Sequence, residues 1–411
     1  MSDWRDTTLG EFVALQRGHD LTEPQRRNGH VPVMGSAGQN GFHDTALAKG
    51  PGIVIGRSGA SFGQVHFSKE DFWPHNTGLY VTDFKGNDPL FAFYFLKALD
   101  FDRFNSGSAQ PSLNRNFIYP IPIRVPKPAE QKSIASVLGA LDDKIELNRR
   151  MNATLEAMAR ALFQSWFVDF DPVRAKLDGR KPLGMDDATA ALFPKHLEDS
   201  LLGHIPKGWK AGSVVEGFNL TMGQSPPGDT YNDDGNGLPF YQGRTDFGFR
   251  FPTRRIYCSS PTRYAKPGDT LVSVRAPVGD INMANEECCI GRGVAAVRHK
   301  SGATSFTYHS MASLYPDFAR FEAEGTVFGS INKDSFEKLR FVIPPTEIIA
   351  AYERQAGPLD EQIRTLEIQA RTLATLRDTL LPKLLSGELS FTRGNFSAKS
   401  VPQVHPTTLK V

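Results

Sequence analysis

The sequence of 411 residues contains two copies of one long segment, and this duplication constrains the fold more than any other feature. Lys49–Ile55 and Lys266–Val272 both place Pro-Gly before a strand-like apolar run. The turns Ala60–Gly63 and Ala276–Gly279 follow at matching distances. The period is about 216 to 218 residues, whereas solenoid repeats are about 20–50 residues long. The repeated unit is therefore a whole module.

Further matches follow in the same order and nearly in register. Ser112–Asn114 returns as Ser330–Asn332, and each copy closes at a proline, Pro126 or Pro344. A helical segment that contains Gly139–Ile145 then corresponds to one that contains Gly357–Ile363. Each module is thus a domain followed by a helix, and the chain has a pseudo-two-fold internal repeat.

The first part of each module has the pattern of a mixed α/β or α+β domain. Short β-branched runs such as Ile53–Ile55 and Leu271–Val274 are separated by Gly and Pro. One helix is predicted from Pro89 to Ala98, because Asp88 can cap it and proline suits its first turn. Its counterpart, near Ser305–Leu314, has a weaker pattern.

Two heptad patterns follow the two domains and predict two long helices that pack along their length. From Leu359 to Leu385 the second helix would extend about 40 Å. Asn148 and Asn152 interrupt the apolar rows of the first helix, and Gly357-Pro358 is expected to break or kink the second. Ordinary core helices are the alternative, but two equal runs from duplicated modules favour an antiparallel coiled coil. Its predicted pairing residues are Leu141, Ile145, Leu155, Leu162, Leu359, Ile363, Leu366, Leu373 and Leu380.

We therefore expect two globular domains separated by two long helices. A helical spacer of this length is of the order of the roughly 34–36 Å between DNA half-sites one turn apart. The expected parts are a first domain at 1–127, a central helix at 128–170, a connector at 171–205, a second domain at 206–345, a distal helix at 346–388 and a disordered tail at 389–411.

Composition excludes several classes of protein. The 47 basic and 45 acidic residues give a net charge of only +2, so a nucleic-acid surface requires local clustering of charge. The three cysteines, Cys258, Cys288 and Cys289, form no spaced pair typical of a disulfide framework. We found no signal segment or membrane-spanning apolar run, and we expect a cytoplasmic protein with no membrane partner.

Several segments resemble the type I restriction–modification specificity (S) subunits, the HsdS family. Ala161–Val173 is similar to the end of that family's central conserved region. Leu202–Trp209, preceded by Leu192–Pro194, resembles the entry to its second target-recognition domain. Leu381–Leu389 is similar to the end of its distal helix, and Pro128–Lys132 fits the start of the central one. With the duplication, the resemblance covers about residues 1 to 390.

The resemblance implies a subunit that binds double-stranded DNA at an asymmetric bipartite target. Its paired helices would dock two methyltransferase (M) subunits, and restriction/translocase (R) subunits would join through them. It implies no cofactor in this chain, since S-adenosylmethionine, Mg²⁺ and ATP would belong to the partners. A modification-only or type IIB-like assembly is the closest alternative, and a stand-alone DNA-modifying enzyme or a scaffold is a more distant one.

The residues themselves favour a non-catalytic chain with no metal site. No Asn-Pro-Pro-aromatic motif or Gly-x-x-x-x-Gly-Lys-Ser/Thr motif is present. Ser225–Gly228 and Ile343–Pro345 are near misses that we interpret as loop prolines. Asp142-Asp143 could suggest nuclease carboxylates, but adjacent helical residues diverge, and we expect a solvated helix face. The histidines lack metal-ligand spacing.

Candidate DNA-binding residues come from both domains. Arginine is the usual guanine reader and a common phosphate ligand, although these arginines could instead pair with Asp246 and Asp269. Asn114 and Asn332 occupy the same place in both copies, so capping the following segment is as good an interpretation as base reading. The candidates are Arg57, Ser58, Gln110, Asn114, Arg115, Arg244, Arg250, Arg254, Arg255, Arg275, Asn332 and Lys333.

Overall fold

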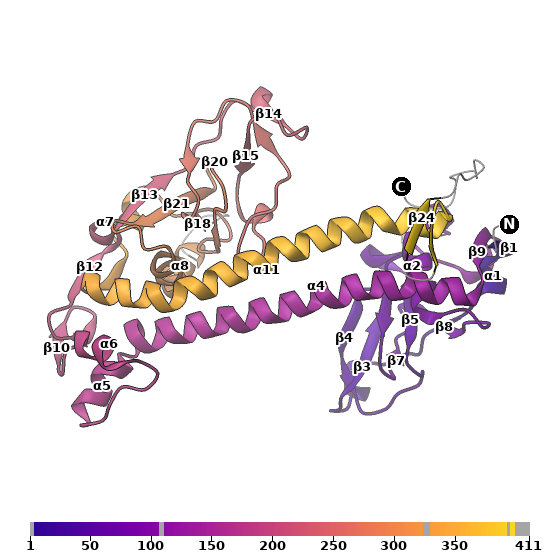
Figure 1. The fold of residues 1–411 in the computed structure, drawn as a ribbon, viewed down its shortest axis with the longest axis horizontal. Coiled ribbons are helices and arrows are strands. Elements are labelled where there is room, and N and C mark those ends of the chain that lie inside the picture. Colours follow the sequence, from indigo (N-terminus) through magenta and orange to yellow (C-terminus); the bar gives the residue numbers. More distant parts are fainter. Residues whose placement is uncertain (1–3, 107–110, 324–328, 393–394, 399–411) are drawn as a thin grey trace. The chain divides into compact units, whose positions relative to one another are not determined.

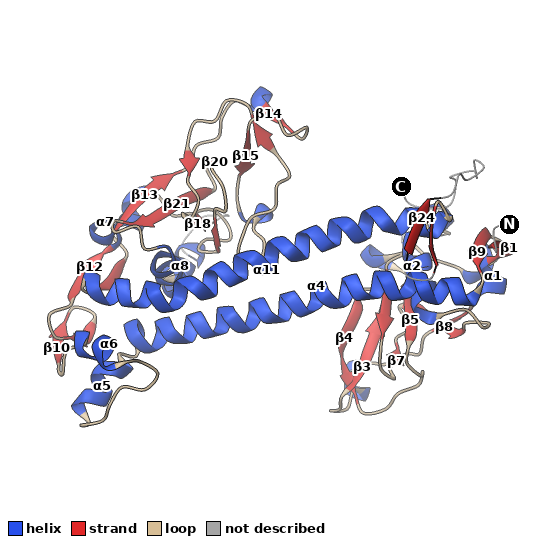
Figure 2. Cartoon of the chain, viewed as in Figure 1, coloured by secondary structure: helices blue, strands red, loops and turns tan. Residues whose placement is uncertain are grey.

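The computed structural model describes residues 4–106, 111–323, 329–392 and 395–398. The chain divides into two compact units, the first formed by Met1–Leu147 with Ala370–Val411 and the second by Asn148–Gln369. Two long helices, α4 (Pro128–Phe163) and α11 (Thr346–Ser386), each contribute to both units. Figure 1 follows the chain through its elements, and Figure 2 shows the mixture of helix and strand in each unit.

The first unit is built on a four-stranded antiparallel sheet. Its strands lie in the order β2 (Ala14–Arg17), β8 (Gly78–Asp83), β5 (Gly52–Gly56) and β6 (Val65–Ser68). All five residues of β5 are buried, as expected for an apolar strand at the centre of a sheet. We call residues 4–126, which precede α4, the first lobe.

Smaller elements complete the first lobe. β1 (Trp4–Thr8) pairs with β9 (Pro122–Pro126) and so closes the lobe directly before α4. A second sheet has the order β4 (Gly38–His43), β3 (Val31–Gly35), β7 (Trp73–Pro74). The short helices are α1 (Leu9–Phe12), α3 (Arg115–Ile118) and the 3₁₀ turns η1 (Glu23–Gln25), η2 (Gly59–Ser61) and η3 (Asp102–Phe104).

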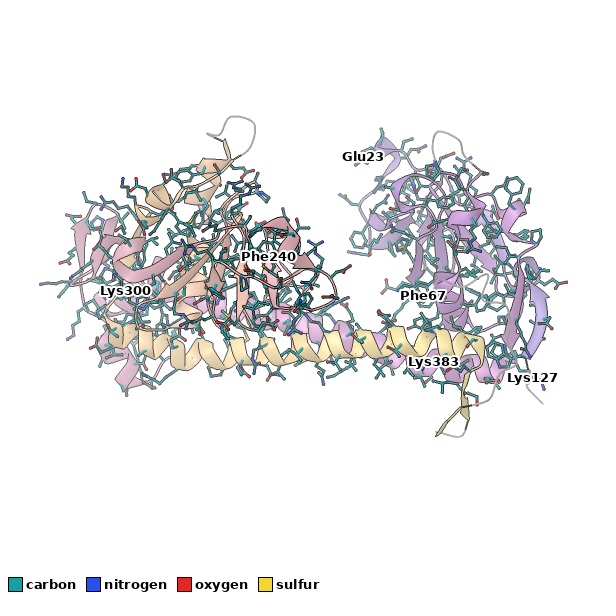
Figure 3. All side chains as sticks on the ribbon, turned by 90° about the horizontal axis from the view of Figure 1, so that it is seen from above. Glu23, Phe67, Lys127, Phe240, Lys300 and Lys383 are labelled. Atoms are coloured by element: carbon teal, nitrogen blue, oxygen red, sulfur yellow. The ribbon has the colours of Figure 1, made fainter. Side chains whose placement is uncertain are left out.

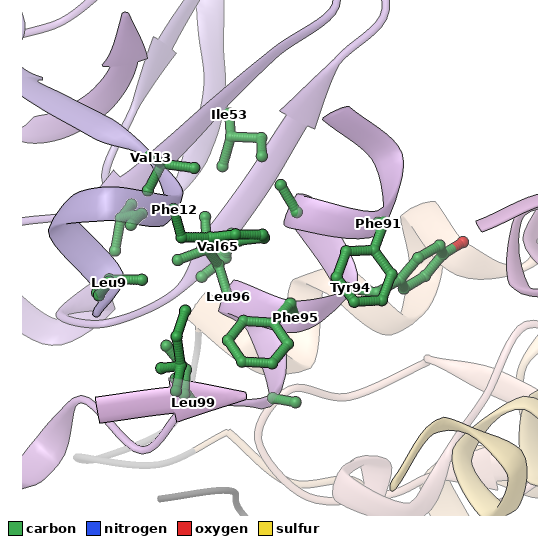
Figure 4. Packing of buried hydrophobic residues seen from close by; sticks show 14 of the residues in the cluster. Leu9, Phe12, Val13, Ile53, Val65, Phe91, Tyr94, Phe95, Leu96 and Leu99 are labelled. Atoms are coloured by element: carbon green, nitrogen blue, oxygen red, sulfur yellow. The ribbon is translucent and has the colours of Figure 1, made fainter. Parts of the chain in front are cut away.

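Helix α2 (Pro89–Ala98) begins where the sequence predicts, since the Asp88 side chain accepts a hydrogen bond from Phe91 N at 2.9 Å. Phe91 and Phe95 on its buried face pack with Phe12 and the strands of the sheet. Figure 4 shows this cluster from close by. The same core includes residues from the start of α4 and the end of α11, so helix ends and lobe share one hydrophobic interior.

The second unit contains a sheet with the same strand order. β13 (Phe218–Met222), β21 (Val294–His299), β18 (Thr270–Ser273) and β19 (Ile281–Met283) are all antiparallel neighbours. In both units the first strand in the chain lies beside the fourth, which lies beside the second and then the third. We call residues 206–343 the second lobe.

The second lobe is closed by β12 (Lys210–Ser213) and β22 (Arg340–Ile343), which pair directly before α11. Its other sheet has the order β14 (Tyr231–Asn232), β16 (Tyr257–Cys258), β15 (Leu238–Tyr241), β20 (Cys288–Ile290) and β17 (Tyr264–Ala265). Its helices are α7 (Val214–Gly217), α8 (Thr304–Ser313), α9 (Tyr315–Ala323), α10 (Lys333–Glu337) and the turns η5 (Gly228–Thr230) and η6 (Arg244–Asp246).

Between α4 and the second lobe the chain is structured. A π-helical turn η4 (Gln164–Val168) extends α4, and Phe170 then adopts a left-handed conformation, φ 55°, before α5 (Asp171–Leu177). α6 (Asp187–Leu192) and the hairpin β10 (Leu197–Ser200) with β11 (Gly203–Pro206) follow. This segment corresponds to the predicted connector.

The two long helices contact each other within each unit. In the first unit Asp142 on α4 bonds Arg377 on α11. In the second, Asn148 contacts Gln369, and Tyr352 donates to the Ala159 carbonyl at 3.3 Å. From Asn148 to Ala159 along α4, the contacted residue on α11 moves back from Gln369 to Tyr352. These two segments of the second unit are therefore antiparallel. Among the predicted pairing residues Ile145, Ile363 and Leu366 are buried, and the other six are half-buried.

Two details of the sequence expectations differ from the structure. Of the break or kink expected at Gly357-Pro358, a break is contradicted, because α11 continues from Thr346 to Ser386 and residues on both sides of the proline, Tyr352 and Ile363, are buried. The predicted disordered tail begins too early. β23 (Leu389–Thr392) pairs with β24 (Asn395–Ala398), and Ser390 is buried. Residues 399–411 lie outside the described residues.

Two further observations concern composition. Cys258, Cys288 and Cys289 are free and buried. Among the helices in the described ranges, none combines the length and apolar character needed to cross a bilayer.

Candidate nucleic-acid interface

The end of β5 brings the candidate residues of the first lobe together. The Arg57 carbonyl accepts a hydrogen bond from Leu113 N at 2.8 Å, and Ser58 forms a β-bridge with Ser112. The Gly-rich turn after β5 therefore lies beside the segment that contains Asn114 and Arg115. Gln110 lies outside the described residues. Backbone pairing, rather than closeness in sequence, assembles this site.

The second lobe repeats this arrangement at the end of β18. Ile331 N donates to the Val274 carbonyl at 3.0 Å, and Arg275 forms a β-bridge with Ser330. The two bridges join equivalent positions of the two copies, since Arg275 corresponds to Ser58. The Arg275 side chain is exposed. The same backbone frame thus carries a serine in one lobe and an exposed arginine in the other.

Asn114 and Asn332 are helix caps. Asn114 Oδ1 accepts from Asn116 N at 3.0 Å, and Asn332 Oδ1 accepts from Ser335 N at 2.9 Å. Each amide oxygen thereby satisfies a backbone donor at the start of a short helix. The capping interpretation accounts for the presence of asparagine in both copies.

The neighbouring cations are partly engaged. Arg115 donates to the Leu15 carbonyl at 2.9 Å and so ties α3 to β2, while Lys333 lies 3.5 Å from Glu337. Arg57 is half-buried, and within the described part of the chain its Nε has no hydrogen-bond partner. An unpaired buried donor of this kind is costly and remains able to bond an incoming acceptor.

Arg250 is a correction to the predicted DNA-binding set. Its side chain is only 1% exposed, and its guanidinium pairs with Glu156 on α4 and with Asp360 on α11. The guanidinium carbon also lies 3.8 Å from the centroid of the Tyr308 ring. Arg250 is therefore not available to DNA, because its guanidinium is buried within the protein.

Three other candidate arginines of the second lobe, Arg244, Arg254 and Arg255, are exposed at the surface but have acidic partners. Arg254 is bidentate to Glu286, and this hydrogen-bonded pairing raises the pKa of Arg254. Arg255 Nη2 lies 2.6 Å from Asp246 Oδ1, as the pairing alternative predicts. Asp269 instead pairs with Arg298. Arg244 pairs with Asp280 at 2.9 Å. The side chains of Arg244, Arg254 and Arg255 keep much of their surface exposed. To bind DNA, each would have to release its carboxylate partner and bond a phosphate instead.

One cavity was missed from the sequence, and its two arginines are paired, Arg26 with Glu23 and Arg27 with Asp44. This cavity of about 560 Å³ in the first lobe is lined by Glu23, Arg26, Arg27, Asn28, Gly29, His30 and Phe42. Glu23 lies on the side of the lobe away from the helices, whereas Phe67 lies near them (Figure 3). The Phe42 ring is 54% exposed. In the sequence, the adjacent Arg26 and Arg27 within a segment that contains Pro and Asn were the only pattern that could have indicated this cavity.

The corresponding loop of the second lobe is acidic, whereas in the loop of the first lobe Asp20 and Glu23 balance Arg26 and Arg27. Gly18 and Gly223 follow equivalent strands, β2 and β13, and open the two loops. The loop after Gly223 carries Asp229, Asp233 and Asp234 where the first has Arg26 and Arg27. The two lobes therefore share a framework but present different electrostatic surfaces.

Within the described ranges no group of three or more His, Cys, Asp or Glu side chains is arranged to hold a metal ion. Asp142 was expected on a solvated helix face, and this is wrong, because its carboxylate bonds Tyr94 and Arg377. Asp143 does lie exposed, paired with Lys69.

Comparison with known proteins gives consistent relatives. The putative type I restriction enzyme MjaX specificity subunit of Methanocaldococcus jannaschii is 27% identical over 285 residues, which are 68% of this chain and 62% of that protein. The matched part thus spans less than two thirds of this relative. The type I restriction enzyme HindI specificity subunit of Haemophilus influenzae is 25% identical over 330 residues, 68% of this chain and 71% of the relative.

A solved structure shares the fold. The type I restriction-modification system S subunit from M. genitalium aligns with a TM-score of 0.62 over 93% of this chain and 96% of that one, at 16% identity. The family model of the type I restriction modification DNA specificity domain matches residues 1–157 and again residues 206–377. The chain therefore belongs to the type I restriction–modification DNA specificity family, as its sequence resemblance predicted.

Proposed function

We propose that this chain selects the DNA sequence on which a type I restriction–modification assembly acts, with each lobe reading one half of an asymmetric bipartite target. The observation that carries the proposal is the repeated site at the ends of β5 and β18. Ser58 pairs with Ser112 in one lobe, and Arg275 pairs with Ser330 in the other. One backbone frame with different side chains suits two different half-sites, since base edges are read by side-chain groups.

The proposal assigns the long helices a spacer role. An antiparallel coiled coil would relate the two modules by a pseudo-two-fold axis, the arrangement that suits two half-sites along one duplex. The antiparallel contacts Asn148–Gln369 and Tyr352–Ala159 support such pairing in the second unit. The same helices would dock two methyltransferase subunits, and restriction subunits would join through these.

Catalysis belongs to the partners in this proposal. The sequence lacks the Asn-Pro-Pro-aromatic and Gly-x-x-x-x-Gly-Lys-Ser/Thr motifs. S-adenosylmethionine, Mg²⁺ and ATP would accordingly bind the methyltransferase and restriction subunits, in the cytoplasm. A modification-only assembly would use the chain in the same way, without the restriction subunits.

Methylome sequencing of a host that expresses this chain with its methyltransferase partner tests the proposal. We expect one asymmetric bipartite methylation motif that is absent when the chain is omitted. Identical methylation without the chain, or methylation by the purified chain alone, contradicts the proposal. A phage-restriction assay with and without the restriction subunit then separates the full assembly from the modification-only one.

Exchange of the first lobe for that of a relative tests independent reading. We expect one half of the methylation motif to change and the other half to be retained. A change in both halves would contradict the assignment of one half-site to each lobe.

A further inference from the structure

Two carboxylates occupy the same place in the repeat, and each is more enclosed than the acidic residue that follows it. Asp142 on α4 corresponds to Asp360 on α11 in the duplicated segment. Their side chains are 31% and 12% exposed. The next residues, Asp143 and Glu361, also correspond and are 70% and 60% exposed. Each helix thus presents one enclosed and one solvated carboxylate side by side.

In the first unit Asp142 joins three elements. Its Oδ2 accepts a hydrogen bond from the Tyr94 hydroxyl of α2 at 2.6 Å, and its Oδ1 accepts from Arg377 Nη1 of α11 at 2.6 Å. Burial and this hydrogen bond raise the pKa of Tyr94, so its hydroxyl remains a donor. Figure 4 shows the Tyr94 ring beside Phe91, with its hydroxyl directed away from the cluster. One carboxylate therefore links lobe, α4 and α11.

In the second unit Asp360 takes part in a three-element junction that is centred on Arg250. Asp360 Oδ1 accepts from Arg250 Nη1 at 2.6 Å, and Arg250 Nη2 bonds Glu156 on α4. Arg250 belongs to the second lobe, between η6 and β16, and its guanidinium covers the Tyr308 ring of α8. Lobe, α4 and α11 again meet at a single charged cluster.

Stability alone is a poor reason for these clusters. Desolvation of buried ions offsets most of their mutual attraction, and well-packed apolar groups often serve equally well. Their directional bonds instead allow one arrangement of the joined elements. The Lys69–Asp143 and Arg364–Glu361 pairs are exposed, and pairs of that kind contribute little. A three-element junction is present at the same position of both modules, although the donors are Tyr94 and Arg377 in one and Arg250 in the other. This recurrence points to a role in positioning the joined elements.

We infer that Asp142 and Asp360 are positioning residues that fix the angle at which each lobe is held on its own segment of the long helices, and thereby restrict the spacer length between the two half-sites. This inference rests on the proposed function. Loss of either junction leaves the base-contacting surface of the lobe intact but allows the lobe to rotate on the helices.

A spacer scan tests the inference. Asp142→Asn and Asp360→Asn remove one charge without changing side-chain size, and Asp143→Asn and Glu361→Gln are matched neighbouring controls. Each variant is assembled with the methyltransferase partner. Methylation is then measured on duplexes that carry the native half-sites with spacers of native length, one base pair shorter and one base pair longer.

The junction variants should lower the preference for the native spacer by about three- to tenfold, a usual range for loss of a coupled polar network. Their half-site bases should stay unchanged, and the two controls should keep the wild-type preference. If Asp360→Asn fails to fold, Arg250→Lys keeps the charge but loses the two-pronged geometry. Tyr94→Phe removes only the lobe donor in the first unit.

Two negative results have different meanings. Unchanged spacer preference in all junction variants, even with lower melting temperatures, overturns the positioning role and leaves the proposed function standing. Absence of any sequence preference in the wild-type complex refutes the proposed function itself.

Discussion

Asn148 Nδ2 donates to Gln369 Oε1 at 2.8 Å across the paired helices of the second unit, from a fully buried position in a row of otherwise apolar residues. Its Oδ1 is buried, and no partner for it is found in the described ranges. A buried asparagine in a heptad row generally costs stability while fixing the register of the helices.

Asn148→Leu should therefore stabilise the second unit by about 1 kcal/mol, because an unpaired buried oxygen is replaced by apolar packing. Urea denaturation measures the change. Gln369→Ala is the companion variant and should destabilise, since it removes the acceptor and leaves the amide with the weaker Leu366 carbonyl contact at 3.4 Å. Loss of stability in Asn148→Leu would show that the amide does more than set register.

Gly18 and Gly223 should not tolerate a side chain. They follow β2 and β13, and each donates its N–H to the first residue of the neighbouring strand, Gly78 at 3.0 Å and Val294 at 2.9 Å. A Cβ would overlap the backbone carbonyl of His75 or Gly291. Alanine at either position should cost about 1–3 kcal/mol, the usual cost of overpacking.

Thermal unfolding measures this cost. Gly228→Ala is the control, because a Cβ there meets no atom within 4 Å. Equal melting temperatures for Gly18→Ala, Gly223→Ala and the control would contradict the close backbone approach.

The stability of the second unit should fall in mild acid because of His309. This residue is 2% exposed, and burial lowers its pKa to about 4; Glu156 and Asp360 act against this shift, whereas Arg250 and Arg160 add to it. The folded state therefore holds the neutral ring, and the unfolded state binds the proton more tightly. The stabilisation is complete above the unfolded pKa near 6.5 and is lost as the pH falls toward 4.

The largest loss from this residue is about 3 kcal/mol, from the size of the shift. Calorimetric melting between pH 7 and 4.5 measures it, and His309→Gln should flatten the profile. Burial also lowers the pKa of His299, which therefore reduces stability in acid in the same way. Burial raises the pKa of Glu353, and this residue therefore has the opposite effect on stability as the pH falls. A profile that His309→Gln leaves unchanged would assign the acid sensitivity to other groups.

Arg275 should matter more for DNA binding than Arg254. Arg275 is exposed beside Ser330, whereas both nitrogen donors of the Arg254 fork are held by Glu286. Arg275→Ala should weaken binding of the assembled complex to its target by about tenfold, the cost of one arginine contact to a base or phosphate. Arg254→Ala should have a smaller effect.

Titration of binding at several salt concentrations identifies the kind of contact. If the slope of the logarithm of the binding constant against the logarithm of the salt concentration falls by about one, Arg275 contacts a phosphate. If base preference is relaxed at one position of the target, Arg275 reads a base. An unchanged affinity in Arg275→Ala would remove this residue from the interface.

Local patterns decided much of the architecture. The duplicated Pro-Gly and Ala-x-x-Gly segments marked the equivalent strands, and the Asp88-Pro89 start of α2 is present as predicted. α4 begins at Pro128 and α11 at Thr346, where the heptad patterns placed the two helices. Such features are set by neighbours a few residues apart, through backbone geometry and apolar periodicity. For that reason a single sequence carries them in readable form.

Only the tertiary structure decided which polar groups are enclosed. Arg250 looked like other arginines in its segment, yet its partners Glu156 and Asp360 lie 94 and 110 positions away in the chain. Asp142 and Asp143 are adjacent, but one is enclosed and the other solvated, because successive helical side chains point in different directions. Likewise Pro358 stays inside a continuous helix, since contacts from distant segments hold both sides of it. The direction of a side chain and its distant partners are properties of the folded chain, and local sequence pattern does not contain them.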